Sequence, residues 1–213
     1  MYKISVVSPT IRPRGLEPIR ESLLNQTFTE FEWLTEVGLD KHDLNAAFNR
    51  MIKRASGELI VFAEDFMKFP PDYLQKFWDA YQLDPNVFWT APVGKTLDWK
   101  EIKWDWRGYS DAVDTTYNCW EIDSGAAPKK ALYDIGGFDE ELDQFWSCDN
   151  VSVGWRAYLK GYKFKNLFNN PAMVYDHDAT EPHPFRDKYN PGFNNERMEL
   201  VKMGQLKIDY LNE

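Results

Sequence analysis

Residues 59–65 read LIVFAED, an apolar run followed directly by two acidic residues. An apolar run of this kind is typical of a central parallel strand that is covered on both faces. In open α/β sheets, ligands bind beyond the carboxyl ends of such strands, which is where Glu64 and Asp65 fall. Two carboxylates at that position are costly unless a cation or a hydrogen-bond donor satisfies them. The stretch therefore predicts a parallel sheet with an acidic site at its edge.

Strand and helix patterns alternate on both sides of this stretch. Residues 4–8 and 31–35 are short runs rich in β-branched or aromatic residues, which predict two further strands. Apolar residues recur at helical spacing in three segments, residues 16–24, 43–55 and 70–81. Asp43 is expected to cap the second of these helices and Gly57 to end it. This order predicts an α/β fold with a mostly parallel central sheet flanked by helices.

The second half of the chain is less regular but shows no break between domains. Short helices are predicted over residues 128–135 and 150–160, each followed by glycine. Residues 184–213 are polar at first and then helical, which is the pattern of a C-terminal appendage. The sequence has no internal repeat, low-complexity tract or linker, so residues 1–213 are predicted to form a single domain.

Composition narrows the classes of function. The net charge of −9 argues against a broad basic surface for nucleic acid, because phosphate contacts need clustered Lys and Arg. Cys119 and Cys148 form neither a disulfide framework nor a repeated CxxC pattern. The N-terminus lacks the apolar segment of a signal peptide, and no stretch approaches the roughly 20 apolar residues of a membrane span. The protein is therefore expected to be soluble and cytoplasmic.

Three further features carry candidate chemistry. His177 lies between two Asp residues just after a short apolar segment, so it is either a metal ligand, which this setting makes more plausible, or an ordinary surface or hydrogen-bonded His, the commoner case for a lone His. Asp149 begins a predicted helix, where it is either a simple N-cap or a general base that deprotonates a hydroxyl group. The aromatic segment at residues 99–106 either forms a lid or acceptor platform or packs as ordinary core.

Several short segments occur in an order that is shared with a known family. They are VVSPT (6–10), LLNQTF (23–28), NAAFN (45–49), ASGELIVF (55–62), SGAA (124–127), GGFDE (136–140), DN (149–150), Arg156 and GY (161–162). This ordered set covers roughly residues 4–180 and resembles the GT-A glycosyltransferases, especially the large family 2 group. The resemblance implies a Rossmann-like GT-A domain that binds a nucleotide-sugar donor.

The resemblance also implies roles for particular residues. Measured back from Pro70, the metal-binding DxD motif of the family falls on residues 63–65, so Asp65 would hold a divalent cation, Mn²⁺ or Mg²⁺. His177 would be the later metal ligand that some GT-A enzymes carry. The nucleotide pocket would be lined by Pro9, Thr10, Glu36, Asn49 and Glu64.

The sequence departs from the DxD motif and from the segment after the second strand. Ala63 replaces the first Asp of DxD, so either Glu64 substitutes for it or the metal rests on Asp65 and His177 alone. Residues 36–39 read EVGL where the family carries Asp-Asp-Gly-Ser, a segment that recognises the base. Both changes fall within the predicted donor pocket.

A third departure concerns the catalytic base. Counting back from Arg156 places Asp149 on a Glu of the family and Asn150 on its catalytic Asp. Either the register slips by one residue and Asp149 is the base, or the base lies elsewhere. We take Asp149 as the predicted base.

The predicted function is a metal-dependent, inverting transfer of a sugar from a nucleotide-diphosphate sugar, UDP by family, to an acceptor hydroxyl. The acceptor is a glycan, a lipid-linked sugar, a protein or a hydroxymethylated base in phage-type DNA. One alternative is a catalytically degenerate module that binds nucleotide sugars or glycans, as Ala63 and Asn150 suggest. Another is nucleotidyl transfer on the same fold, but RPRG at residues 12–15 only partly resembles the Gly-rich basic loop of that chemistry.

Overall fold

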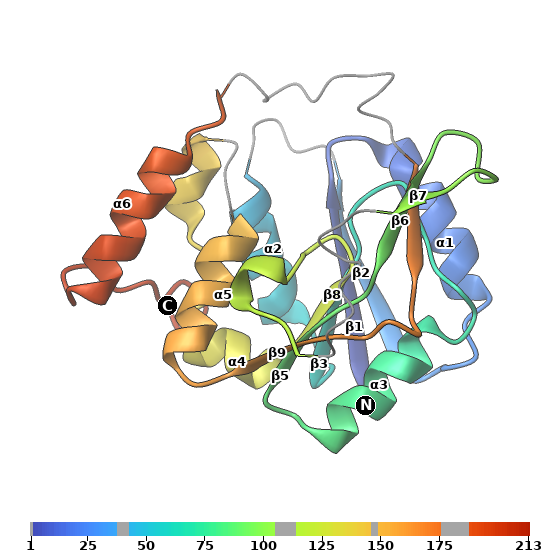
Figure 1. Cartoon of the computed structure of the whole chain (residues 1–213), viewed down its shortest axis with the longest axis horizontal. Helices are drawn as coiled ribbons and strands as arrows, with labels where there is room; N and C mark the ends of the chain where they lie inside the picture. The colour runs from blue at the N-terminus through green and yellow to red at the C-terminus, as the bar shows by residue number, and fades with distance from the viewer. Residues whose placement is uncertain (1, 38–42, 105–113, 146–148, 176–187) are drawn as a thin grey trace.

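The structure, a computed structural model, describes residues 2–37, 43–104, 114–145, 149–175 and 188–213 (Figure 1). Its centre is a six-stranded sheet in the order β2-β1-β3-β8-β5-β9. The strands are β1 (Ile4–Thr10), β2 (Phe31–Val37), β3 (Leu59–Phe62), β5 (Val87–Thr90), β8 (Gly125–Pro128) and β9 (Lys163–Asn166). Within this sheet β8 runs antiparallel to both neighbours and the other pairs are parallel. The predicted α/β fold with a mostly parallel central sheet is therefore confirmed.

Helices cover both faces of the sheet, α1 and α3 on one side and α2, α4 and α5 on the other (Figure 1). Their bounds are α1 (Leu16–Leu24), α2 (Leu44–Arg54), α3 (Tyr73–Leu83), α4 (Lys129–Asp134) and α5 (Asp149–Leu159). Strand β3 shows why its sequence is apolar throughout. Leu59 and Val61 pack into the core beside α1 and α3, whereas Ile60 and Phe62 pack into the core beside α2 and α5.

A smaller sheet extends from the carboxyl ends of the central strands, in the order β4-β10-β6-β7. It consists of β4 (Met67–Lys68), β6 (Val93–Thr96), β7 (Lys103–Trp104) and β10 (Ala172–Tyr175). Strand β4 follows β3 along the chain, and β6 follows β5. The described connections include the short 3-10 helices η1 (Pro13–Gly15), η2 (Tyr117–Cys119) and η3 (Glu140–Gln144).

Helix α2 starts after Asp43 as predicted, but the predicted capping bond and the predicted end at Gly57 are wrong. Asp43 occupies the N-cap position, but its side chain makes no capping hydrogen bond, and its Oδ2 pairs with Arg50 at 3.3 Å. The helix N-terminus is instead capped from a distance by the carboxylate of Asp143. Gly57 does not end the helix, because the backbone already becomes extended at Ala55. A Cβ at Gly57 would lie 2.5 Å from backbone atoms of β1, so glycine is required for this close approach.

The C-terminal residues pack against the sheet side that carries α2 and α5. Arg197, from α6 (Pro191–Lys202), forms two hydrogen bonds to the buried carboxylate of Asp139. Leu211 joins the hydrophobic core beside α2, and its N–H donates to the carbonyl of Gly136 at 3.3 Å. The segment predicted as an appendage is thus tied to the core by an ion pair and an apolar contact. In the part of the chain that the structure describes, no helix combines the length and apolarity needed to cross a membrane.

Candidate active site

The segment after β3, the segment before β8 and the start of α5 bring acidic side chains to one edge of the sheet. Asp65 and Glu64 follow β3, and β8 brings residues 121–124 to the same edge because it runs in the opposite direction. Burial raises the pKa of Glu64 well above its ordinary value, and the charges of Asp123, Asp65, Asp149 and Glu121 raise it further. The acidic edge predicted from the sequence is therefore larger than the DxD-like segment alone.

Asp65 is bound by the loop that follows β1. Its Oδ1 accepts a hydrogen bond from Nη2 of Arg12 at 2.9 Å, and its Oδ2 accepts one from Nε of Arg12 at 3.0 Å. Thr10 donates its hydroxyl to the same Oδ2 at 2.6 Å. The pair is largely shielded, with 18% of the Arg12 side chain and 8% of the Asp65 side chain exposed. Thr10 and Asp65, both predicted site residues, are thus brought together, and both bind Arg12.

The turn after Asp65 is locked to the same loop. Phe66 adopts a left-handed backbone with φ of 63°, which is uncommon for a bulky residue, and its N–H donates to the carbonyl of Gly15 at 2.8 Å. The ring of Phe66 lies beneath two guanidinium groups, whose central carbons are 5.4 Å (Arg12) and 5.8 Å (Arg14) from its centroid. A strained backbone of this kind persists only where many surrounding contacts hold it in place.

Gly15→Ala is expected to disrupt this lock. A Cβ at Gly15 would lie 2.5 Å from the Cβ of Asp65, so the loop and the turn must move apart. We expect the free energy of unfolding to fall by about 1–3 kcal/mol, as in other overpacked sites. Urea unfolding measures this effect, with Gly192→Ala as the control because only one atom lies near its added Cβ, at 3.3 Å. Equal stability of the two variants would show that the loop yields without cost.

Asp149 lies at the start of α5, deep in the site. It is 5% exposed, and its Oδ1 accepts a hydrogen bond from Nδ2 of Asn45 at 3.1 Å. Burial raises its pKa well above the ordinary value for Asp, and the charges of Asp143 and Asp139 act in the same direction. Raised pKa values of this kind are typical of carboxylates that exchange protons near neutral pH.

Asn150, which falls on the catalytic Asp of the family pattern, is held away from Asp149. Its Nδ2 donates to the carbonyl of Trp120 at 2.9 Å and to Oε2 of Glu121 at 3.0 Å. The amide therefore joins α5 to the segment before β8. Of the two neighbours Asp149 and Asn150, Asp149 is therefore the one that can act as a base.

Asp143 links the helix cap to the pH dependence of folding. Burial raises its pKa to about 6, although N–H groups of Ala46 and Asn45 favour its charged form. The folded protein therefore binds more protons than the unfolded chain between about pH 4 and pH 6.

The free energy of unfolding is accordingly expected to fall as pH rises through this window, and Asp143 alone accounts for about 1 kcal/mol between pH 5 and pH 7.5. The raised pKa values of Glu64 and Asp149 act in the same direction. Urea unfolding at the two pH values measures the effect, and Asp143→Asn should reduce the difference. An unchanged difference in this variant would assign the pH dependence to other groups.

Glu36 and Asn49, predicted to lie in the nucleotide pocket, have protein partners. Glu36 accepts hydrogen bonds from Arg50 at 2.6 and 2.9 Å and from Arg54 at 3.2 Å. Asn49 donates to the carbonyl of Phe138 and to Glu140, and its Oδ1 accepts from the N–H of Phe138. A nucleotide contact by either side chain stays a prediction and requires these bonds to rearrange. Pro9 is buried in β1 directly opposite Glu36 in the strand register.

The predicted cation site is only partly visible. His177 lies outside the described residues, as does Trp106 of the aromatic segment. Among the described residues, no three His, Cys, Asp or Glu side chains are placed to hold a metal ion together. Both oxygens of Asp65 are already bonded to Arg12, so the described residues do not fit a cation while this pair is intact.

Trp99, from the predicted lid or platform, is ordered by its neighbours. The ammonium of Lys68 lies 4.6 Å from the centroid of its ring, and the ring of Tyr175 lies 5.9 Å away. Trp99 has a left-handed backbone with φ of 62°. The residue therefore packs on the small sheet, and its contact with an acceptor stays a prediction.

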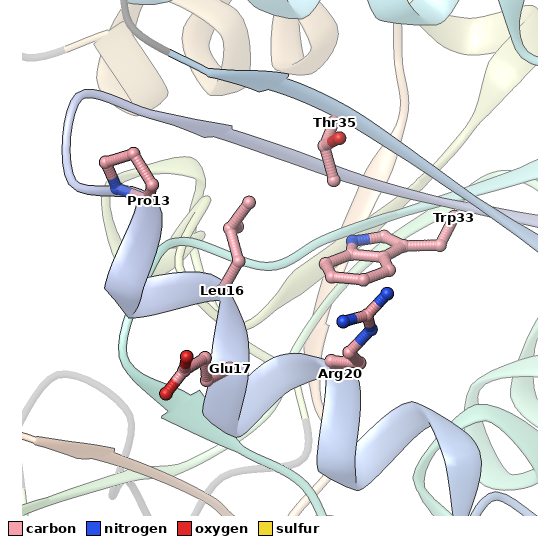
Figure 2. Close-up of a pocket in the computed structure, with 6 residues that line it drawn as sticks. All are labelled: Pro13, Leu16, Glu17, Arg20, Trp33 and Thr35. Carbon is pink, nitrogen blue, oxygen red and sulfur yellow. The ribbon is translucent and has the colours of Figure 1, made fainter.

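A separate groove lies between α1 and the edge strand β2. It has a volume of about 380 Å³, and Figure 2 shows Leu16 and Arg20 of α1 pointing toward Trp33 of β2. The Nε1 of Trp33 donates to the hydroxyl of Ser8 at 3.0 Å, which fixes the ring. None of the residues predicted for the donor pocket lines this groove. Pro13, from the loop after β1, is one of the residues that line it.

Sequence reasoning missed the partners that organise the site. In the sequence, Arg12 and Gly15 show only a weak phosphate-loop pattern, whereas the structure places them against Asp65. Asn45 lies in the NAAFN segment of the family pattern, but its contact with Asp149 spans 104 residues. A local pattern carries no signal for such contacts.

The order and direction of the strands, together with the helices on both faces, define an α/β fold of the GT-A glycosyltransferase type. Among solved structures, the chain is similar to TarS 1-349 of S. aureus in complex with UDP, with a TM-score of 0.65 and 16% sequence identity over 81% of this chain and 60% of that one. The complex of the same protein with UDP-GlcNAc gives a TM-score of 0.63 and 17% identity over 82% and 58% of the two chains. The chain thus spans less than two thirds of these neighbours. Neither a family model nor a curated protein sequence matches it.

Proposed function

We propose that the chain transfers a sugar from a nucleotide-diphosphate sugar, with UDP as the nucleotide, to an acceptor hydroxyl. The observation that carries this proposal is the meeting of Thr10, Arg12, Asp65 and Asp149 at one edge of a GT-A-type sheet. The UDP and UDP-GlcNAc complexes of TarS support a nucleotide-sugar donor. The ordered segments quoted above favour family 2 within this fold.

Asp149 is the proposed base of an inverting transfer. Its carboxylate takes the proton of the acceptor hydroxyl while the oxygen of that hydroxyl forms a bond to the anomeric carbon. The bond from this carbon to the donor phosphate breaks, and the nucleoside diphosphate leaves with the electron pair. The raised pKa of Asp149 supports this role, because a carboxylate in a buried site is a stronger base than one in water.

A divalent cation on Asp65 and His177 stays a prediction from the sequence and contributes no step here. Such an ion would supply positive charge to the leaving diphosphate. Because Arg12 holds both oxygens of Asp65, the described residues offer that charge from a guanidinium instead.

A glycan is the favoured acceptor. The net charge of −9 counts against a surface for duplex DNA, so a modified DNA base is the second choice. A degenerate binding module is the competing class of function, and it would bind the donor without turnover.

The test is a panel of nucleotide sugars that is assayed for binding by calorimetry and for slow donor hydrolysis by release of the nucleoside diphosphate. We expect one UDP-sugar to bind and to be hydrolysed. Binding without hydrolysis, and without transfer to any of a set of oligosaccharides, would favour the binding module. Failure of every nucleotide sugar to bind would contradict the proposed function.

A further inference from the structure

We propose that the guanidinium of Arg12 takes the place of the divalent cation and itself binds the diphosphate of the donor. This inference rests on the proposed function, because it concerns the charge that the leaving group meets. It gives a role to residues 12–15, which the expected cation chemistry does not use.

Both oxygens of the Asp65 carboxylate accept hydrogen bonds from protein donors. Arg12 binds it through two parallel N–H groups at 2.9 and 3.0 Å, and Thr10 adds a third bond at 2.6 Å. Bidentate pairs of this kind are strong and geometrically specific. A cation that took these oxygens would leave Arg12 without its partner in a shielded position, which is unfavourable.

Arg12 is held in place before any ligand arrives. Its backbone N–H donates to the hydroxyl of Thr10 at 2.8 Å, and its guanidinium lies over the ring of Phe66. The close contact between Gly15 and the turn at Asp65 fixes the loop on the other side. A donor group that is positioned in advance loses little entropy when it binds a ligand.

The guanidinium keeps donors for a phosphate. Two of its five N–H groups donate to Asp65, and the other three donate to none of the residues that the structure describes. Planar guanidinium groups bind phosphate oxygens in pairs, which an ammonium cannot do. Arg14 places a second cation over the same ring.

The acidic edge makes such a positive group necessary. Glu64, Glu121, Asp123 and Asp149 meet where the diphosphate of the donor would approach, and each of them that is ionised repels it. Arg12 and Arg14 are the cations that the described loop after β1 presents at this edge. Their charge offsets the repulsion without an ion from solution.

The experiment measures UDP binding by calorimetry in the presence of EDTA and, separately, with Mn²⁺. For the wild type we expect affinities within about threefold of each other. Arg12→Gln should weaken UDP binding in EDTA by about 10- to 100-fold, the usual range for a lost hydrogen bond to a charged group. Uridine, which has no phosphate, should bind both proteins alike. Arg20→Gln is the matched control, because Arg20 lies in the groove of Figure 2, on the helix after this loop.

Two further variants separate binding from folding. Arg12→Lys keeps the charge and loses the fork, so its affinity for UDP should fall between those of wild type and Arg12→Gln. The double variant Arg12→Gln/Asp65→Asn removes the unpaired carboxylate, and it should fold as wild type while still binding UDP weakly in EDTA.

Wild-type binding that requires Mn²⁺, together with unchanged binding of Arg12→Gln in Mn²⁺, would overturn this inference and leave the proposed function standing. Absence of UDP binding in both conditions would contradict the proposed function itself.

Discussion

Asp149→Asn is expected to lower the rate of sugar transfer by about 100- to 10,000-fold, the usual contribution of a general base, while UDP binding stays within about threefold of wild type. The amide has the size of the carboxyl group but cannot take the proton of the acceptor. Its Oδ1 can still accept the hydrogen bond from Asn45, so the start of α5 should keep its position. Removing a buried ionisable group also favours folding at neutral pH.

The measurement is the initial rate of nucleoside diphosphate release with the best donor, or of transfer once an acceptor is known. Asp134→Asn is the matched control, because Asp134 is an exposed partner of Lys160 on the far end of α4. It should leave the rate unchanged. If Asp149→Asn kept the wild-type rate, the base would lie elsewhere and the family register would have to be read differently.

Arg197→Met is expected to destabilise the protein by about 3–5 kcal/mol, because it leaves the carboxylate of Asp139 buried without its partner. Asp139 is only 2% exposed, and Arg197 reaches it with Nε at 2.5 Å and Nη2 at 2.7 Å. The pair joins α6 to η3, and η3 also carries Asp143, which caps α2. Loss of the pair should therefore loosen the wall of the site as well as the C-terminal helix.

Urea unfolding at neutral pH measures this effect, and Lys202→Met serves as the control. Lys202 lies on the same helix and forms an exposed pair with Glu199, a type of pair that contributes about 0–1 kcal/mol. The double variant Arg197→Met/Asp139→Asn should recover only part of the lost stability, because it removes the buried carboxylate but leaves the buried Arg156 without the charge of Asp139. A loss of less than 1 kcal/mol for Arg197→Met would mean that α6 contributes little to the fold.

Local patterns predicted the strands of the sheet well, because the same short run of residues determines both that a strand forms and which of its faces are buried. Residues 59–63 are apolar on both faces, and the structure buries both faces of β3. The helix that starts after Asp43 and the helix that begins near Asp149 were also expected from spacing alone. The acidic end of β3 was predicted for the same reason, since it follows the strand directly.

The features that organise the site were not predictable, because each depends on residues far apart in the chain. Arg12 meets Asp65 across 53 residues, and Asp143 caps α2 across 98 residues. The reversed direction of β8, which brings residues 121–124 to the acidic edge, is decided by its pairing with β3 and β5. Periodicity within a segment carries no information on such pairings.

The measurement that tests the central claim most directly is a crystal structure of the protein with UDP bound. The account predicts that the uridine lies beyond the ends of β1 and β2 and that phosphate oxygens lie within hydrogen-bond distance of Arg12. UDP bound instead in the groove between α1 and β2, with no contact to Arg12 or to the acidic edge, would contradict it.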